Sequence, residues 1–262
     1  MGTRRLSRFT ARPALLGLLA GIVLANGGPA AVAGGMMGTT ITAAYVDATI
    51  ALDPADPAWD AASTATVDLT RFIDFVEETA GTGLEGSAGV VTDMECMMMG
   101  QMISRSISVE AVHNGTDIFF RFEWADASAD TVVEEPNLFG DALAMEIPYS
   151  GTGDTALAMG TPTEPVNIMF WRADLAAPQN IVAGSVGTLQ PSPDAQNMAR
   201  YQSWANGAWT VIVRRPMTTV TDNQINLLRG SDYDVAFAAW DGSDKNRDGR
   251  KAISDWHTLS IE

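Results

Sequence analysis

The feature that most constrains the fold is a pair of apolar runs joined by a tight-turn sequence in residues 103–124. Residues 103–109 lead into His113-Asn114-Gly115, and a run rich in aromatic side chains follows at 118–124. Asn-Gly between two apolar runs is a strong signal for a two-residue hairpin turn. We therefore expect two antiparallel strands here, with His113 at the hairpin tip and its imidazole in solvent.

Other short runs of strand character are separated by turn-forming clusters such as Asp53-Pro54 and the glycines at 151–153. They lie at residues 40–52, 138–148, 166–172, 209–215 and on both sides of a turn within 235–262. Residues 175–199 have little pattern, and no sustained helical stripe or long repeat follows residue 34. This organisation predicts an all-β fold, a single-domain antiparallel β-sandwich with long loops.

The first residues have the pattern of an export signal. Four arginines precede an apolar stretch at 13–26, and Ala31-Val32-Ala33 offers small residues for cleavage. We expect residues 1–33 to be removed after either general secretory or twin-arginine export, which leaves a domain at 34–262 in the periplasm or outside the cell. No later apolar stretch is long enough for a transmembrane helix.

Charge and cysteine content exclude several classes of protein. Loss of the four N-terminal arginines would take the formal net charge from −16 to about −20. Such a surface repels nucleic acids and anionic lipid. Cys96 is the single cysteine, so the chain has no internal disulfide, no cysteine-ligated iron–sulfur cluster and no c-type haem attachment. The sequence also contains no Gly-x-Ser-x-Gly elbow and no phosphate-binding loop.

Lys251 is one of two lysines in a chain that otherwise uses arginine, and it begins the last strand-like stretch after a Gly- and Asp-rich turn. It shares strand parity with Ile253, Leu259 and Ile261, so its aliphatic stem can start on an apolar face. Unlike arginine, a buried lysine can lose its proton and offer a lone pair. A solvated lysine beside a turn is the competing interpretation.

Two stretches suggest metal chemistry of other kinds. The segment from Asp244 to Asp255 has oxygen-bearing side chains at the spacing of an EF-hand loop, although Lys251 occupies an aliphatic position and the following sequence alternates like a strand. The run Met94–Met102 has five methionines in nine residues, which is typical either of adaptable apolar packing or of a copper(I) site.

Four segments, in this order along the chain, resemble the family of haem b-binding gamma subunits of type II dimethyl-sulfoxide-reductase-like molybdoenzymes. The family includes ethylbenzene dehydrogenase, dimethylsulfide dehydrogenase, selenate and chlorate reductases, and relatives of nitrite oxidoreductase. The segments are residues 113–118 with 122–124, residues 139–144, Met159-Gly160 before 165–168, and residues 240–243 with 247–256.

The resemblance implies a β-sandwich that holds one non-covalent haem b between an axial methionine, Met159, and an axial lysine, Lys251. It also implies that Asn167 and Trp171 contact the cofactor, although Met169-Phe170-Trp171 departs from the family pattern and the 94–102 run offers competing thioethers. The implied function is electron transfer between the iron–sulfur beta subunit of a periplasmic molybdenum complex and a soluble cytochrome or other carrier. Catalysis would lie on the molybdenum-containing alpha subunit.

A second hypothesis comes from a different class. A secreted β-sandwich could bind carbohydrate or calcium without any redox centre, and aromatic rings could stack on sugars. The candidate rings are Trp59, Trp171, Trp204 and Trp209.

Overall fold

The computed structural model describes residues 38–73, 90–91, 105–133, 138–157, 159–185 and 187–262. Within these residues there are fifteen strands and one short 3₁₀ helix, η1 (Pro57–Ala61). The strands are β1 (Thr40–Tyr45), β2 (Ala65–Leu69), β3 (Arg71–Ile73), β4 (Val90–Val91), β5 (Arg105–His113), β6 (Asp117–Ala125), β7 (Ala142–Pro148), β8 (Val166–Arg172), β9 (Gln179–Ala183), β10 (Gln190–Pro191), β11 (Ala199–Ala205), β12 (Ala208–Pro216), β13 (Asp232–Trp240), β14 (Lys251–Ile253) and β15 (His257–Ile261). The all-β class predicted from the sequence is confirmed.

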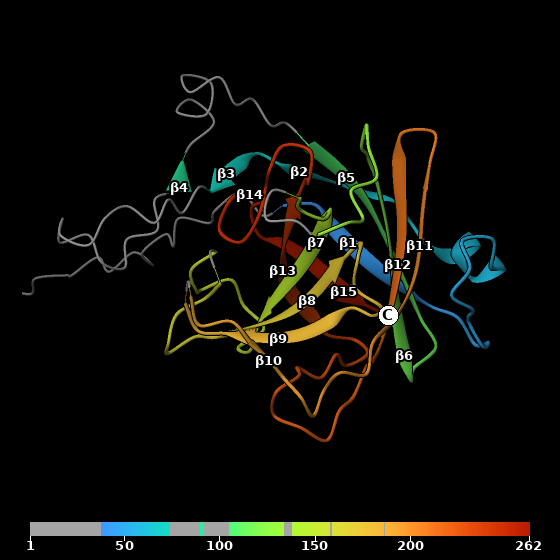
Figure 1. The fold of residues 1–262 in the computed structure, drawn as a ribbon. Coiled ribbons are helices and arrows are strands. Elements are labelled where there is room, and N and C mark those ends of the chain that lie inside the picture. Colours follow the sequence, from blue (N-terminus) through green and yellow to red (C-terminus); the bar gives the residue numbers. More distant parts are fainter. Residues whose placement is uncertain (1–37, 74–89, 92–104, 134–137, 158, 186) are drawn as a thin grey trace, which may run out of the picture. The chain divides into compact units, whose positions relative to one another are not determined.

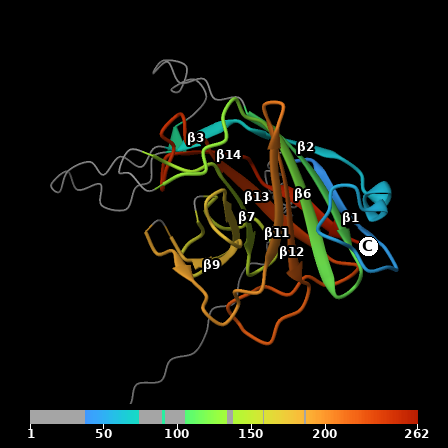
Figure 2. The same ribbon diagram turned by 45° about the vertical axis from the view of Figure 1, so that its right-hand side comes forward.

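One strand, β13, belongs to both layers of the sandwich. The hydrogen-bonded order is β10-β9-β8-β7-β13-β15-β1-β5-β6-β12-β11. Residues 232–235 of β13 pair with β15, and residues 236–240 pair with β7. A strand that passes from one sheet to the other forms a corner between two packed layers. Figure 1 shows β6, β11 and β12 together on the right-hand side, apart from β7, β8 and β9, and Figure 2 shows β9 separated from β12 in a second view.

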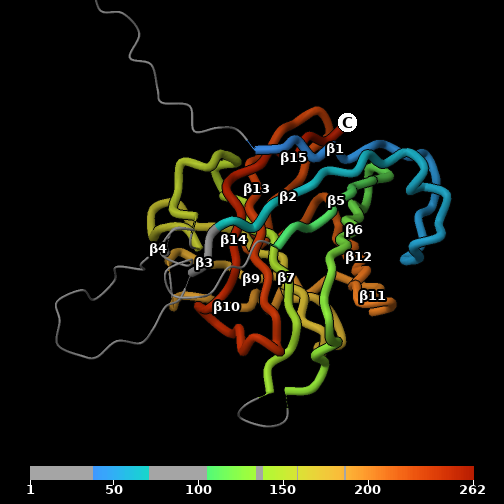
Figure 3. Tube along the Cα trace, turned by 90° about the horizontal axis from the view of Figure 1, so that it is seen from above, coloured from blue at the N-terminus to red at the C-terminus, as the bar shows by residue number. Residues whose placement is uncertain are grey.

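Among the described strands the pairing is antiparallel, as expected for most of the sandwich, except at β1. β1 lies between β15 and β5 and is parallel to both. Figure 3 shows β1 and β15 side by side next to the C-terminus. The long connection from β1 through η1 and β2 to β5 makes this parallel pairing possible, because parallel neighbours cannot be joined by a tight turn.

The predicted hairpin is formed by β5 and β6, with Gly115 at φ 84° in the turn. The expectation that His113 is solvated was wrong. Its side chain is fully buried, and its Nε2 lies 2.9 Å from the carbonyl oxygen of Glu262. Burial lowers the pKa of His113. The turn alone would expose this residue, but β1 and the end of the chain cover it.

Side chains of β7 and β8 alternate between two apolar clusters, as successive strand residues must. Leu143, Met145, Met169 and Trp171 face the main core between the layers. Ala142, Ala144, Val166 and Ile168 face outward and join a second cluster with residues of β9 and β13. The outer face of this sheet is therefore also apolar, whereas an antiparallel sheet that packs one face on a core commonly has polar side chains on the other.

Candidate functional site

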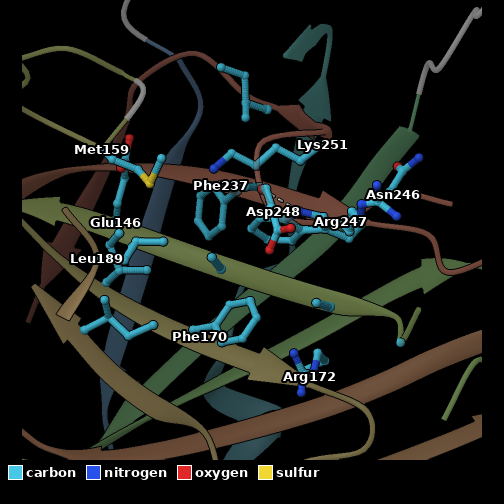
Figure 4. Close-up of a pocket in the computed structure, with 18 of the residues that line it drawn as sticks. Glu146, Met159, Phe170, Arg172, Leu189, Phe237, Asn246, Arg247, Asp248 and Lys251 are labelled. Carbon is cyan, nitrogen blue, oxygen red and sulfur yellow. Dashed lines mark hydrogen bonds between the residues drawn. The ribbon is translucent and has the colours of Figure 1, made fainter. Parts of the chain in front are cut away.

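A cavity of about 540 Å³ lies on this outer face, over β7, β8 and β13. Its volume falls within the range of about 300–1,000 Å³ typical of sites for small molecules and cofactors. Loop residues 138–140, Leu157, Met159 and residues 246–248 form its rim. Figure 4 shows the side chains that line it.

Alanines form the floor of the cavity. Ala142 and Ala144 come from β7, and Ala236 and Ala238 from the adjacent half of β13. Ala144 and Ala238 are direct cross-strand partners. Four methyl groups side by side leave a shallow apolar surface on which a flat molecule can lie close to the backbone.

The walls are aromatic and carry two guanidinium groups. The rings of Phe170 and Trp240 meet edge to face, with centroids 5.6 Å apart. The Arg247 guanidinium lies 4.8 Å from the centroid of the Phe139 ring. Arg172 pairs with Asp174 through two hydrogen bonds, of 2.5 and 3.0 Å. Both arginines line the cavity, so an apolar ligand that carries carboxylates would find cations at its edge.

Lys251 reaches the cavity from the first position of β14. The strand follows a two-residue turn, across which Arg247 and Arg250 exchange backbone hydrogen bonds. Only 6% of Lys251 is exposed, and its Nζ lies 5.1 Å from the centroid of the Trp240 ring. Burial lowers the pKa of Lys251, and the nearby carboxylates of Glu146 and Asp248 partly oppose this shift. Burial of the amine therefore favours its neutral form.

Met159 lines the same cavity from the loop between β7 and β8, and it is also buried. Its φ of 66° is in the left-handed region, where bulky side chains are rare. Of the described non-glycine residues with positive φ, Met159 is the only apolar one. The next residue, Gly160, has φ 68°, and a Cβ there would lie 2.7 Å from the carbonyl oxygen of Glu164. A backbone in this region costs about 1–3 kcal/mol, so contacts with the surrounding structure must hold Met159 in this conformation.

Glu146 is a residue of this site that the sequence did not reveal. It projects from β7 beside the alanine floor, and the backbone N–H of Met159 donates a hydrogen bond to its carboxylate. Burial raises the pKa of Glu146 to about 8, with Lys251 opposing the shift. Figure 4 shows Lys251 extending toward Met159, with Glu146 next to Met159. A single glutamate in a chain with 32 acidic residues gave no signal of this role.

The structure brings Met159 and Lys251 together but places Asn167 and Trp171 elsewhere. Both of the latter lie on the opposite face of β8, because odd-numbered residues of this strand point into the main core. Trp171 donates from Nε1 to Oε1 of Gln202 at 2.8 Å, and its ring packs against that of Trp209. These contacts place Trp171 in the main core and not in the lining of the cavity.

Asn167 joins a buried polar network in the same core. Its Nδ2 donates to Asn180 Oδ1 at 2.8 Å and to the Ile181 carbonyl at 3.2 Å. Its Oδ1 accepts from the backbone N–H of Ile225 at 3.2 Å and lies 3.5 Å from Nη1 of the buried Arg215. All four contacts hold the ends of strands and loops together, so Asn167 is a structural residue.

Replacing Asn167 with alanine should therefore destabilise the fold without changing how the cavity binds its ligand. The change removes the partner of two buried donors and two buried acceptors, and we expect the free energy of unfolding to fall by about 3 kcal/mol. Urea denaturation measures this loss. If the variant is as stable as the parent but the absorption spectrum of a molecule bound in the cavity changes, Asn167 contacts that molecule and is not purely structural.

The structure also shows where the residues that suggested carbohydrate, calcium or copper binding lie. Trp59, Trp171 and Trp209 are each at most 6% exposed, so three of the four candidate sugar-stacking rings are in the interior. The segment from Asp244 to Asp255 forms a turn that leads into a strand, without the helix that follows an EF-hand loop. Cys96 and the methionine run at 94–102 lie outside the described residues. In the part of the chain that the structure describes, no helix has the length and apolar character needed to cross a bilayer.

Comparison with known proteins gives similarity over most of the chain. The family model described as ethylbenzene dehydrogenase matches residues 56–194 and 178–252. A candidate heme subunit of respiratory nitrate reductase from Haloferax mediterranei is 31% identical over 152 residues, which cover 58% of this chain and 54% of that protein. The gamma subunit of chlorate reductase from Ideonella dechloratans is 31% identical over 163 residues, which cover 62% of this chain and 67% of that subunit. The chain thus spans about half the length of the first relative and two thirds of the second.

A solved structure supports the fold. A candidate carbohydrate-binding protein from Bacteroides uniformis superposes with a TM-score of 0.51 over 86% of this chain and 100% of that one, at 13% identity. At this identity the likeness extends to the architecture of the sandwich alone.

Proposed function

The chain belongs to the ethylbenzene dehydrogenase family, and on that premise we propose that it is an electron-transfer gamma subunit holding one non-covalent haem b between Met159 and Lys251. The observation that carries the proposal is that these two side chains, 92 positions apart in the sequence, are both buried and line one apolar cavity. The name of one relative, a heme subunit, supports the same cofactor.

The residues of the cavity fit a haem on four counts. The thioether of Met159 is a known type of haem ligand, and the amine of Lys251 would supply a second donor to the iron. The alanine floor and the aromatic walls suit an apolar macrocycle. Arg172 and Arg247 suit its two carboxylates. Burial of Lys251 lowers the pKa of the amine, and only the unprotonated amine can bind a metal.

Each side chain has a separate task in this proposal. Lys251 offers a lone pair, which the cation of the metal further stabilises in the unprotonated state. Met159 offers a soft sulfur that favours ferrous iron and raises the reduction potential. Glu146 holds the Met159 backbone through the hydrogen bond from its N–H. A haem with two protein ligands supplies one-electron transfer and leaves no coordination position for a substrate.

The remaining parts of the function concern partners and location. We propose that the protein passes electrons between an iron–sulfur beta subunit and a soluble cytochrome or similar carrier. The catalytic molybdenum would lie on an alpha subunit. The chlorate reductase relative supports this assembly because its name is that of a gamma subunit. We further propose export to the periplasm, with residues 1–33 as the signal and 34–262 as the haem-binding domain.

The visible spectrum of the purified protein tests the proposal. We expect a Soret band and, after reduction with dithionite, sharp alpha and beta bands of a low-spin b-type haem at one haem per chain. Extraction with acidified organic solvent should remove the colour, because the haem is not covalently attached. A protein that remains colourless after expression with ample haem would overturn the proposed function.

A further inference from the structure

Three buried aspartates meet at the end of the sandwich next to the cavity rim. Asp126 directly follows β6, Asp141 directly precedes β7, and Asp241 directly follows β13. One carboxylate oxygen from each lies within 4.8 Å of the other two. Their exposed fractions are 4%, 0% and 8%. Three loops that are distant in sequence therefore bring three carboxylates into one buried cluster.

Two of the three carboxylates are fixed by hydrogen bonds. Asp141 Oδ2 accepts from Trp209 Nε1 at 3.0 Å and from the backbone N–H of Asp130 at 2.8 Å, while its Oδ1 accepts from the N–H of Gly242 at 2.9 Å. Asp241 Oδ1 accepts from Oγ of Ser243 at 2.7 Å and from nearby backbone N–H groups. These bonds hold the carboxylates in place. Asp141 Oδ1 and Asp241 Oδ2 each accept a single hydrogen bond among the described residues, so each retains a lone pair for another contact.

Asp126 is different because one of its oxygens is unpartnered. Its side chain is 1% exposed, and Oδ1 accepts only a long bond of 3.3 Å from the N–H of Ser128. Its Oδ2 is buried and has no hydrogen-bond partner among the described residues. The nearest cation is Arg105 Nη1 at 3.9 Å, which is beyond hydrogen-bond distance. A buried carboxylate oxygen with one distant cation and no hydrogen-bond partner is costly and therefore suggests a missing ligand.

The charge of the cluster indicates what that ligand is. Arg105 contacts Asp241 and lies near Asp126, so one guanidinium faces three carboxylates. Two negative charges remain formally uncompensated among these groups. Burial and the charges of Asp141 and Asp241 raise the pKa of Asp126 to about 6, so its carboxylate is still largely ionised above pH 7. One divalent cation would bring the cluster to neutrality.

We propose that Asp126, Asp141 and Asp241 bind one calcium ion. The donors are all oxygens, which hard cations such as calcium prefer. Calcium–oxygen distances of about 2.3–2.6 Å allow two ligands of one ion to lie up to about 5 Å apart, which matches the spacing of the cluster. The site is distinct from the segment Asp244–Asp255 that the sequence suggested, where Asp244 and Asp248 are exposed.

The ion would fix the rim of the proposed haem cavity without touching the haem. Asp141 lies between Gly140 and Ala142, and Asp241 follows Trp240, and these three neighbours all line the cavity. The loops at 138–140 and 246–248 would be tied together through one ion. The proposal itself does not depend on haem binding, because the three aspartates and their charge are independent of the cofactor.

The test uses the purified full chain, stripped with EGTA and passed through a desalting column. We expect calcium titration to give one bound ion per chain, and calcium at a hundredfold excess over Kd to raise Tm by roughly 5–10 °C. Absence of a bound ion together with an unchanged Tm would overturn the proposal. A rise in Tm produced by magnesium and not by calcium would overturn the choice of ion.

Two variants locate the ion. Asp126→Asn keeps the shape of the side chain but removes the unpartnered charge, so the calcium-dependent rise in Tm should vanish. Without calcium, the same variant should be at least as stable as the parent, because the repulsion within the cluster is relieved. Asp244→Asn is the control, since it removes the charge of an exposed aspartate and should leave the calcium response unchanged. The reverse pattern, with loss only in Asp244→Asn, would place the ion in the turn and contradict the proposal.

Discussion

Replacing Lys251 with alanine should abolish the low-spin spectrum of the haem-loaded protein. The buried amine is the proposed axial donor, and the described structure offers no second lysine at the cavity. Loss of one strong-field ligand leaves iron high-spin, or leaves the haem too weakly held to survive purification. We expect the sharp reduced alpha and beta bands to disappear and the haem content per chain to fall several-fold. Absorption spectra and a pyridine haemochrome assay measure the two effects.

Two further substitutions test whether the effect comes from loss of the Lys251 amine itself. Lys251→Arg keeps the length and the positive charge, but a guanidinium does not deprotonate in a protein, so this variant should also lose the low-spin spectrum. Lys245→Ala removes the other lysine of the chain, which is exposed in the preceding turn, and should change nothing. A normal low-spin spectrum in Lys251→Ala would contradict the ligation proposed here.

The fold was predictable where local chemistry dominates. The strand predicted at 166–172 coincides with β8, because Pro165 precedes it and a turn that contains Asp174 follows it. The hairpin at β5 and β6 follows from Asn-Gly. By contrast, β9 lies in residues 175–199, which show little pattern, and β10 is only two residues long. β9 exists because its backbone pairs with β8, a tertiary contact that propensity does not encode.

The candidate site was predictable only in part from residue type and strand parity. Met159 and Lys251 line one cavity together with Ile253, whose shared parity with Lys251 was predicted. Leu259 and Ile261, which were given the same parity, lie instead in the main core. Asn167 and Trp171 also lie on the strand that borders the cavity, but on its other face. A sequence shows which residues of a strand share a face and not which of two apolar faces is hollow. β8 is apolar on both sides, so periodicity could not separate them.

The backbone holds Met159 and Lys251 in different ways, and Glu146 contributes to holding Met159. Lys251 is in a regular strand, whereas Met159 has a strained φ of 66° and depends on the contacts of its loop. The hydrogen bond from the Met159 N–H to Glu146 links that loop to β7. The buried carboxylate of Glu146 also lies near Lys251. Glu146, Met159 and Lys251 are therefore neighbours in the fold although they are far apart in the sequence.

Replacing Met159 with histidine should keep a low-spin haem but lower its reduction potential. An imidazole can occupy the axial position, and histidine tolerates a positive φ better than most residues. It lacks the preference of a thioether for ferrous iron, so we expect a fall on the order of 100 mV in a potentiometric titration, within the range of about 0.8 V that axial ligands span. Met159→Ala should instead lose the low-spin spectrum.

Met169→Leu is the matched control for this pair, because Met169 is buried on the opposite face of β8 and should leave both spectrum and potential unchanged. If Met159→Ala retains a low-spin haem, Met159 is not the ligand, and the thioethers of residues 94–102 become the candidates. If Met159→His shifts the potential while Met169→Leu does not, the shift is due to ligation and not to general loosening of the core. The difference between these two methionines, one on each face of the same sheet, therefore decides which face holds the redox centre.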